Sequence, residues 1–442
     1  MIRALVLGLV VLVTAVAVLL SAAAAAPQRS APAASADPMA TVSREYVRLV
    51  LALGKHDRDY VDAYYGPDDL KKEAEAAALG LDAIGQGAAT LSERVKKMPA
   101  GGDELSVLRR QYLEKQLGAM SARVRMLKGE RLSFDDESKA LYDAVAPHHD
   151  EKHFQVILDR LEKRFPGSGP LVDRFDAWRR AFVIPRDKLD TVFQAAIAAC
   201  RDRTAAHLKL PAGESFTVEY VTGKSWSGYN WYQGNFRSLI QVNTDLPIYV
   251  DRAVDLACHE GYPGHHVYNA LLEQHLVKNR GWLEFTVYPL FSPQSLIAEG
   301  TANYGIAVAF PGSSRIEFER SKLFPLAGLD TARATEYYET QALVEELSYA
   351  GNEAARLYLD GKIDRDAAAA WLQRYALMPK DRAAQRVRFF DQYRSYVINY
   401  NYGKDLVRGY IESRGGTADN PAKRWQEFEK LLSSPRLPSG LK

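Results

Sequence analysis

The segment His259–His266, with the sequence HEGYPGHH, constrains the fold more than any other part of the chain. Three of the nine histidines fall within this segment, and Glu260 directly follows the first of them. Proline breaks the hydrogen-bond ladder of a helix, and glycine permits backbone dihedrals that other residues avoid. The segment therefore predicts a helix that is interrupted at Pro263-Gly264.

Clustered histidines beside a carboxylate are typical of a metal site. The zinc motif HExxH is absent, because position 263 is proline. His259 and His266 are seven residues apart, which on a straight helix corresponds to about 10 Å of rise. One zinc ion with ligand distances of about 2.1 Å cannot bridge that gap. A bulge at Pro263-Gly264 would bring a later histidine back to His259, whereas a histidine-rich turn without metal is the alternative.

A catalytic zinc ion takes three protein ligands and leaves one position for water. The third candidate is Glu299, in the segment Leu296–Tyr304 (LIAEGTANY), which has the pattern of a helix. Its neighbours are apolar or small, and a carboxylate among them would be costly without a partner. Glu345 and Glu346 are weaker candidates because they belong to an ordinary amphipathic helix.

Two further groups of potential ligands are weighed against a structural role. His148, His149 and His153 lie beside Asp150 and Glu151, and this density of charge favours an exposed turn. The two cysteines, Cys200 and Cys258, could form a disulfide bond in an exported protein, but their spacing does not decide whether they meet. As a metal ligand, Cys258 would point about 100° away from His259 on a helix.

The fold is predicted to be mainly α-helical with a small β-sheet. A stripe of apolar residues from Leu105 to Leu127 recurs at steps of three and four, as in an amphipathic helix. Ser133 is placed to cap the next helix, with Glu137 in its first turn. Phe216–Val221 and Ser238–Asn243 have the alternation of strands and flank a segment rich in glycine and aromatic residues.

Four regions follow from these patterns. Residues 1–26 resemble a signal peptide, since Arg3 precedes the apolar run Ala4–Leu20 and small residues follow. An uncleaved membrane anchor is the alternative, because about 20 apolar residues also span a bilayer. Residues 27–40 are rich in Ala, Pro and Ser and predict a disordered linker. A helical scaffold lobe, 41–215, and a catalytic lobe, 216–442, complete the chain.

The composition gives no indication of a nucleic-acid partner. The formal net charge is +2, and charged residues make up 25% of the chain, as in an ordinary soluble protein. Basic residues recur in Arg382–Arg388, directly before the aromatic residues Phe389 and Phe390. Their helical spacing favours a solvated helix face.

Several of these segments resemble a bacterial domain-of-unknown-function family assigned as zinc peptidases and carrying the motif HExxPGHH. The resemblance includes HEGYPGHH, AEGTANY, Gly129–Val145, Val221–Pro247 and the Tyr400-Asn-Tyr-Gly segment, and it spans about residues 42 to 415. Arg394-Ser-Tyr-Val stands where many members have Pro-Gly-Gln. The resemblance implies a gluzincin-like, mainly helical fold with a small sheet beside the active-site cleft.

The resemblance also implies ligands and roles. His259, a histidine of the PGHH segment and Glu299 would bind zinc, with Glu260 as general base. Related helical metallopeptidases place a Gly-His pair at the end of their motif, followed by a small residue, an aliphatic residue and Tyr. Gly264–Tyr268 fits this frame with His265 as the ligand, which favours His265 over His266. His266 would then support the site or face the substrate.

We therefore expect an exported zinc hydrolase that cleaves peptide bonds. Tyr400, with Tyr402 in reserve, would donate a hydrogen bond to the developing oxyanion. Two interpretations of Ser238–Asn243 stay open: an edge strand that binds an extended peptide, with Gly228, Tyr229 and Trp231 lining the cleft, or a hairpin that buries aromatic residues. The alternative functions are a zinc amidase or esterase with a non-peptide substrate, and a non-catalytic metal-binding protein.

Overall fold

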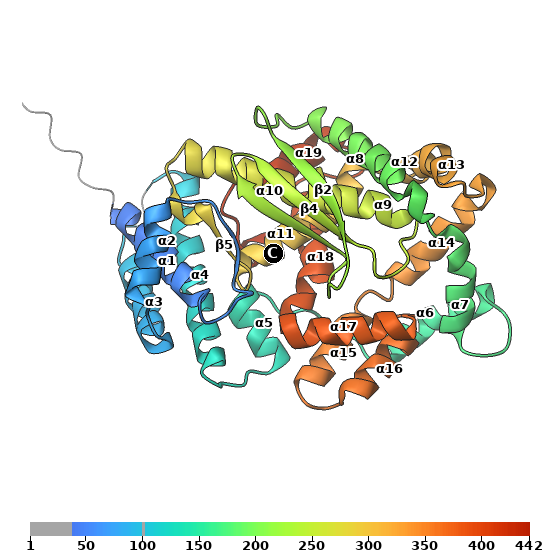
Figure 1. Cartoon of the computed structure of the whole chain (residues 1–442), viewed down its shortest axis with the longest axis horizontal. Coiled ribbons are helices and arrows are strands. Elements are labelled where there is room, and N and C mark those ends of the chain that lie inside the picture. Colours follow the sequence, from blue (N-terminus) through green and yellow to red (C-terminus); the bar gives the residue numbers. More distant parts are fainter. Residues whose placement is uncertain (1–37, 100–101) are drawn as a thin grey trace, which may run out of the picture. The chain divides into compact units, whose positions relative to one another are not determined.

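The computed structural model describes residues 38–99 and 102–442, and in this range the predicted mainly helical fold with small sheets is confirmed (Figure 1). The predicted signal segment and residues 27–37 of the predicted linker lie outside the described residues. The first helix begins at Pro38, so the last three residues of that linker are helical. Within the described ranges, no helix has the length and apolar character needed to cross a membrane.

The first half of the described chain is mostly helical, and α1, α3 and α4 are in mutual contact, whereas α6 packs against α14 and α16 of the second half. The amphipathic stripe predicted for 105–127 is helix α4, and Ser133 caps α5 by accepting a hydrogen bond from the backbone N–H of Asp136. These helices are α1 (Pro38–Leu53), α2 (Asp68–Ala77), α3 (Leu81–Lys96), α4 (Glu104–Leu127), α5 (Phe134–Tyr142), α6 (Glu151–Arg164), α7 (Leu171–Arg179) and α8 (Leu189–Ala205).

Two small sheets interrupt the helices. One has three strands in the order β2-β4-β3, formed by β2 (Ser215–Val221), β3 (Gly228–Gly234) and β4 (Arg237–Asn243). β3 and β4 form an antiparallel hairpin, whereas β2 and β4 run parallel. The other sheet pairs β1 (Val61–Tyr64) with β5 (Val287–Pro289), which lie far apart in the sequence.

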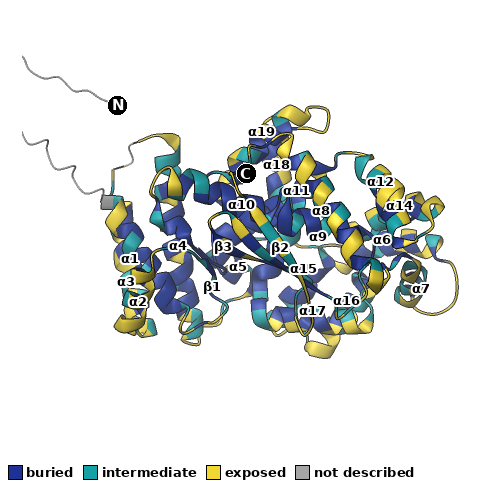
Figure 2. Cartoon of the chain, turned by 45° about the horizontal axis from the view of Figure 1, so that its top comes forward, coloured by how far each residue is buried: buried dark blue, intermediate teal, exposed yellow. Residues whose placement is uncertain are grey.

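The second half of the chain returns to helices. They are α9 (Asp251–Leu256), α10 (His265–Leu272), α11 (Pro293–Ala309), α12 (Ser314–Phe318), α13 (Phe324–Ala327), α14 (Ala334–Glu345), α15 (Ala350–Leu359), α16 (Arg365–Tyr375), α17 (Lys380–Tyr393), α18 (Ile398–Ser413) and α19 (Pro421–Leu432). α11 is buried on nearly all sides (Figure 2), as expected for a helix that is apolar all round.

Helices α11 and α18 cross at a pair of glycines. A Cβ atom added to Gly300 would lie 2.5 Å from the carbonyl oxygen of Gly403, and one added to Gly403 would lie 2.9 Å from the carbonyl oxygen of Leu296. Neither position therefore tolerates a side chain without separation of the two backbones. The crossing sets the spacing between Glu299 on α11 and Tyr400 on α18.

A disulfide bond joins the two cysteines, which settles a question that the sequence left open. Cys200 on α8 is bonded to Cys258, with a Cα–Cα distance of 5.7 Å. The thiol of Cys258 is therefore not available as a metal ligand. The bond ties the segment that contains His259 to a helix of the first half of the chain.

Candidate metal centre

The predicted interruption of the helix around HEGYPGHH is confirmed. α9 passes into a π-helical turn over Ala257–Gly261, Tyr262 is extended, and α10 begins at His265. Gly264 lies at the break, where its N–H donates to the carbonyl of Cys258 at 2.9 Å. A Cβ atom at this position would lie 1.9 Å from the carbonyl oxygen of His259. The glycine thus allows the chain to fold back directly over His259.

This fold brings His259, His265 and Glu299 together, and they are the only group of three potential ligands that the described residues place within reach of one ion. The Nε2 atoms of His259 and His265 are 3.1 Å apart. Glu299 Oε2 lies 3.2 Å from His259 Nε2 and 3.7 Å from His265 Nε2. A tetrahedral zinc ion with ligand distances of about 2.0–2.1 Å requires ligand–ligand separations of about 3.4 Å. The triangle has this size.

The immediate surroundings of Glu299 also fit a bound cation. Its Oε2 atom is buried and has no hydrogen-bond partner among the described residues, although it faces both imidazole rings. Its Oε1 atom accepts a hydrogen bond from the hydroxyl of Tyr396 at 2.8 Å, an interaction that orients the carboxylate. Burial acts to raise the pKa of Glu299, but the contacts with His259 and His265 hold it below its ordinary value. The carboxylate is therefore ionised and available as a ligand.

Glu260 lies next to the three candidate ligands without belonging to them. Its Oε1 atom is 4.0 Å from His259 Nε2, and only 4% of the residue is exposed. Its backbone carbonyl accepts a hydrogen bond from the side chain of Asn230 at 2.7 Å. Burial raises the pKa of Glu260 to about 7, an effect that His265 opposes and Glu299 reinforces. A carboxyl group with this pKa can both accept and release a proton near neutral pH.

Of the two tyrosines proposed to stabilise an oxyanion, Tyr400 is the one whose pKa is influenced by Glu299 and Glu260. Burial raises its pKa well above the ordinary value, and Glu299 raises it further. The phenol is therefore protonated, and its hydroxyl makes no hydrogen bond to any described residue. Tyr402 lies instead near Tyr349. Nothing in the sequence indicated that Tyr396 would contact Glu299, apart from its position four residues before Tyr400.

The remaining candidate ligands from the sequence lie elsewhere. His266 is buried, with Nδ1 2.9 Å from Ser238 Oγ and Nε2 3.0 Å from Glu214 Oε2; it therefore supports the site from within the core and does not face a substrate. Glu345 and Glu346 are exposed and pair with Lys404 and Arg160. The nitrogen atom of His148 contacts Asp135 at the surface, and His149 stacks on His153.

The interpretation of Ser238–Asn243 as an edge strand is wrong. It forms most of β4, which is the central strand and pairs on both sides, so its backbone has no free edge for a peptide. The alternative, a hairpin, is what forms: β3 returns through Asn235 and Phe236, both with positive φ, into β4.

Side chains of β3 alternate between the two faces of the hairpin, as strand geometry requires. Gly228 lies against Glu260, and Tyr229 donates a hydrogen bond to Asp62. Trp231 shares the face of Tyr229, with the two ring centres 4.5 Å apart, but it is 39% exposed and donates a hydrogen bond to Gln241.

Asp62 is a neighbour of the site that sequence analysis did not identify. It lies on β1, some 200 residues before the histidines, and His265 and Glu299 both influence its pKa. Burial raises the pKa of Asp62 to about 6, whereas the hydrogen bond from Tyr229 lowers it. No local pattern marks a single aspartate on a four-residue strand.

The interpretation of Arg382–Arg388 as a solvated helix face is wrong for two of its arginines. Arg388 is exposed, but Arg382 and Arg386 are partly buried. Arg386 lies over the rings of Phe389 and Tyr400, at 5.1 and 6.0 Å from their centres. This face of α17 therefore meets the surroundings of the metal centre.

Comparison with known proteins gives no family assignment. No family model and no curated protein matches the chain. Among solved structures, the chain is similar to the "putative lipoprotein" from Colwellia psychrerythraea, with a TM-score of 0.49 and 15% identity, over 84% of this chain and 71% of that one. The assignment of the site therefore rests on its geometry.

Proposed function

We propose that the protein is a zinc-dependent hydrolase that cleaves peptide bonds. The observation that supports this most strongly is the triangle of His259 Nε2, His265 Nε2 and Glu299 Oε2, with the separations that one tetrahedral ion needs. Zinc bound there would lower the pKa of a water molecule toward 7 and polarise a carbonyl group. The two histidines are 13% exposed, which leaves the site open to water and substrate.

The protein side chains supply the proton transfers. Glu260 is close to the ligands yet too far from the centre of the triangle to be counted among them, so it accepts a proton from the attacking water and delivers it to the leaving amine. Tyr400 donates a hydrogen bond to the negative charge that develops on the carbonyl oxygen. Tyr396 keeps Glu299 in place through its hydroxyl.

Metal content and turnover test this proposal separately. His259→Ala and Glu299→Ala are expected to lose zinc, measured by elemental analysis of the purified protein, while His148→Ala serves as a control from an exposed histidine. Glu260→Gln should retain zinc and lose turnover by about 10²–10⁴-fold. Full turnover in Glu260→Gln would remove this residue from the role of base.

Substrate class is tested with a peptide library, with and without a chelator. Cleavage that a chelator abolishes and added zinc restores supports a metallopeptidase. Hydrolysis of simple amides or esters without peptide cleavage would favour a zinc amidase or esterase. Zinc binding without any hydrolysis would favour a non-catalytic metal-binding protein.

We also propose that the chain is exported. The apolar N-terminal run and the disulfide bond support this location, because disulfide bonds persist mainly in oxidising compartments. Cell fractionation, with mass determination of the mature N-terminus, tests it and distinguishes cleavage from anchoring.

A further inference from the structure

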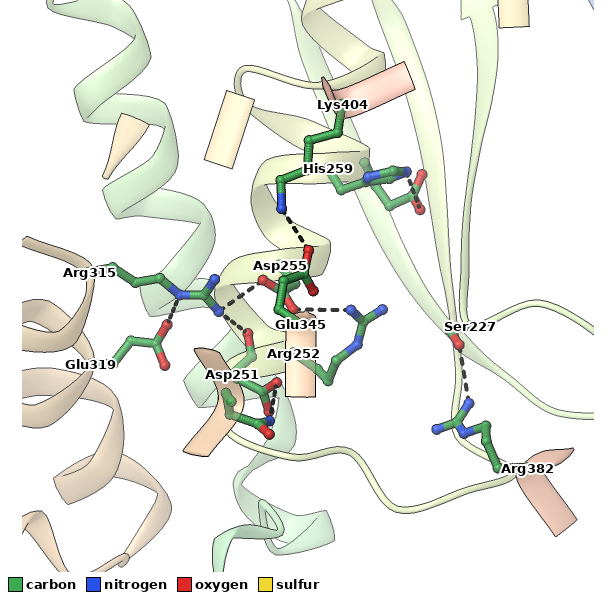
Figure 3. A network of polar contacts seen from close by, with 12 residues as sticks. Ser227, Asp251, Arg252, Asp255, His259, Arg315, Glu319, Glu345, Arg382 and Lys404 are labelled. Atoms are coloured by element: carbon green, nitrogen blue, oxygen red, sulfur yellow. Dashed lines mark hydrogen bonds and ion pairs between the residues drawn. The ribbon is translucent and has the colours of Figure 1, made fainter. Parts of the chain in front are cut away.

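Three arginines lie together on one side of the candidate metal centre. Arg252 belongs to α9, two helical turns before His259, and Arg382 and Arg386 lie one turn apart on α17. In Figure 3, Arg382 contacts Ser227 and Arg252 contacts Asp255, and both arginines border the same pocket. All three side chains are partly buried. We call them the arginine cluster.

The arginine cluster has more positive charge than its neighbours neutralise. Arg252 contacts Asp255 at 3.1 Å, but Asp255 is shared with Arg315 at 2.8 Å. Among the residues that the structure describes, Arg382 donates hydrogen bonds only to the neutral acceptors Ser227 Oγ and Gln385 Oε1, both at 3.3 Å. Arg386 has neither a hydrogen bond nor an ion pair with any residue in the described part of the chain, and its guanidinium lies over the rings of Phe389 and Tyr400.

An open pocket lies against this cluster. It is small, with a cavity volume of about 20 Å³. Two of the three arginines, Arg252 and Arg382, belong to its lining, together with Gln385, Ser227, Asn243 and Leu256. Burial, and then the neighbouring Arg252 and Arg386, together lower the pKa of Arg382 to about 10. A bound anion would relieve this repulsion between like charges.

The pocket adjoins the side of the metal centre where Glu260 lies. A Cβ atom on Gly228 would be 2.9 Å from both Glu260 Oε1 and Leu256 Cδ2, so the carboxylate lies close to Leu256, which belongs to the pocket wall. Arg386 contacts the ring of Tyr400, whose pKa Glu260 and Glu299 influence. If Glu260 passes a proton to the leaving amine, the amine product must lie on this side.

We propose that the arginine cluster is a carboxylate-binding subsite that holds the leaving part of the substrate. The assignment of the cluster to the leaving side of the cleaved bond rests on the proposed function. The binding of a carboxylate to the cluster does not depend on turnover. The planar guanidinium groups match a carboxylate, which they bind through paired hydrogen bonds. The ligand is therefore a peptide with a carboxylate close to the cleaved bond, either the free C-terminus or an acidic side chain.

Binding without turnover tests the subsite directly. The zinc-loaded Glu260→Gln protein is titrated in a calorimeter with N-acetyl-trialanine bearing a free C-terminal carboxylate, and with the C-terminal amide of the same peptide. The acid is expected to bind about tenfold to hundredfold more tightly than the amide, the range for a hydrogen bond to a charged group. Equal affinities, or no detectable binding of the acid, overturn the proposal.

Variants of α17 assign the preference to the cluster. Arg386→Gln and Arg382→Gln should each reduce the ratio of acid to amide affinity by about tenfold, while Arg388→Gln, an exposed arginine on the same helix, should leave it unchanged. Arg386→Lys keeps the charge and should retain part of the preference, which separates lost charge from lost packing. A ratio unchanged in both Arg→Gln variants, with melting temperatures like the parent, refutes the assignment.

A third peptide and a turnover assay complete the design. The amide of N-acetyl-Ala-Ala-Asp carries its carboxylate on a side chain, so tight binding of this peptide assigns the subsite to acidic residues, and weak binding assigns it to chain ends. Peptide cleavage with no preference for the acid would refute the subsite and leave the hydrolase intact. Acid-selective binding without cleavage of any peptide would support the subsite and contradict the proposed hydrolase function.

Discussion

Replacement of Gly264 by alanine should damage both the stability and the metal affinity of the protein. The added Cβ atom would lie 1.9 Å from the carbonyl oxygen of His259 and 2.4 Å from that of Cys258. Close contacts between carbon and carbonyl oxygen are about 3.3–3.6 Å, so the backbone on one side must move by more than about 1 Å. Both obstacles are main-chain atoms, which cannot rotate away as a side chain could.

The magnitude follows from this geometry. Overpacking of a core costs about 1–3 kcal/mol when side chains can adjust, and we expect Gly264→Ala to exceed this range, at about 3–5 kcal/mol. Because ligands must be held within about 0.5 Å, a displacement of this size should also separate His265 from His259. Urea unfolding measures the loss of stability, and zinc titration measures the loss of affinity.

A matched glycine gives the control. Gly118 lies on the exposed face of α4, and a Cβ atom there meets nothing within 4 Å. Gly118→Ala should raise the free energy of unfolding by about 0.5–1 kcal/mol, because alanine loses less backbone freedom in a helix. If Gly264→Ala unfolds at the same urea concentration as the parent and binds zinc equally well, the close approach of the chain over His259 is not required.

Two further predictions concern Asp62 and the disulfide bond. Because the pKa of Asp62 is raised from 3.8 to about 6 in the folded protein, the stability of the metal-free protein should fall as pH rises from about 4 to 6, by less than about 3 kcal/mol given its partial burial. Asp62→Asn should remove this fall and raise the melting temperature at about pH 8 but not at about pH 4; an unchanged pH dependence would contradict it. Cys200→Ser opens a loop of 58 residues and should lower the free energy of unfolding by about 2–4 kcal/mol; an unchanged urea midpoint would argue against a stabilising disulfide bond.

The part of the site that could be predicted from sequence is the part that depends on local chemistry. Pro263-Gly264 cannot continue a helix, so the interruption beside His259 followed from backbone sterics alone. Glu299 stood out because a carboxylate in an apolar helix needs a partner. In both cases the residue and its immediate neighbours carried the information.

The remaining features depend on which elements meet in space. Periodicity places Arg382 and Arg386 on one face of a helix, but it does not say that this face meets the metal centre. The pattern of β4 is that of a half-buried strand, and only the parallel pairing with β2 makes it central. Asp62 reaches the site because β1 pairs with β5, across more than two hundred residues of sequence.

The crossing of Gly300 and Gly403 makes the width of the reaction site a property of the main chain. Glu299 and Tyr400 are held on α11 and α18, whose backbones approach each other closely at Gly300 and Gly403. Residues elsewhere on these helices can therefore be substituted without a change in the distance between Glu299 and Tyr400. A single methyl group at either glycine would increase this distance. The two glycines therefore determine the size of the group that fits between the two helices.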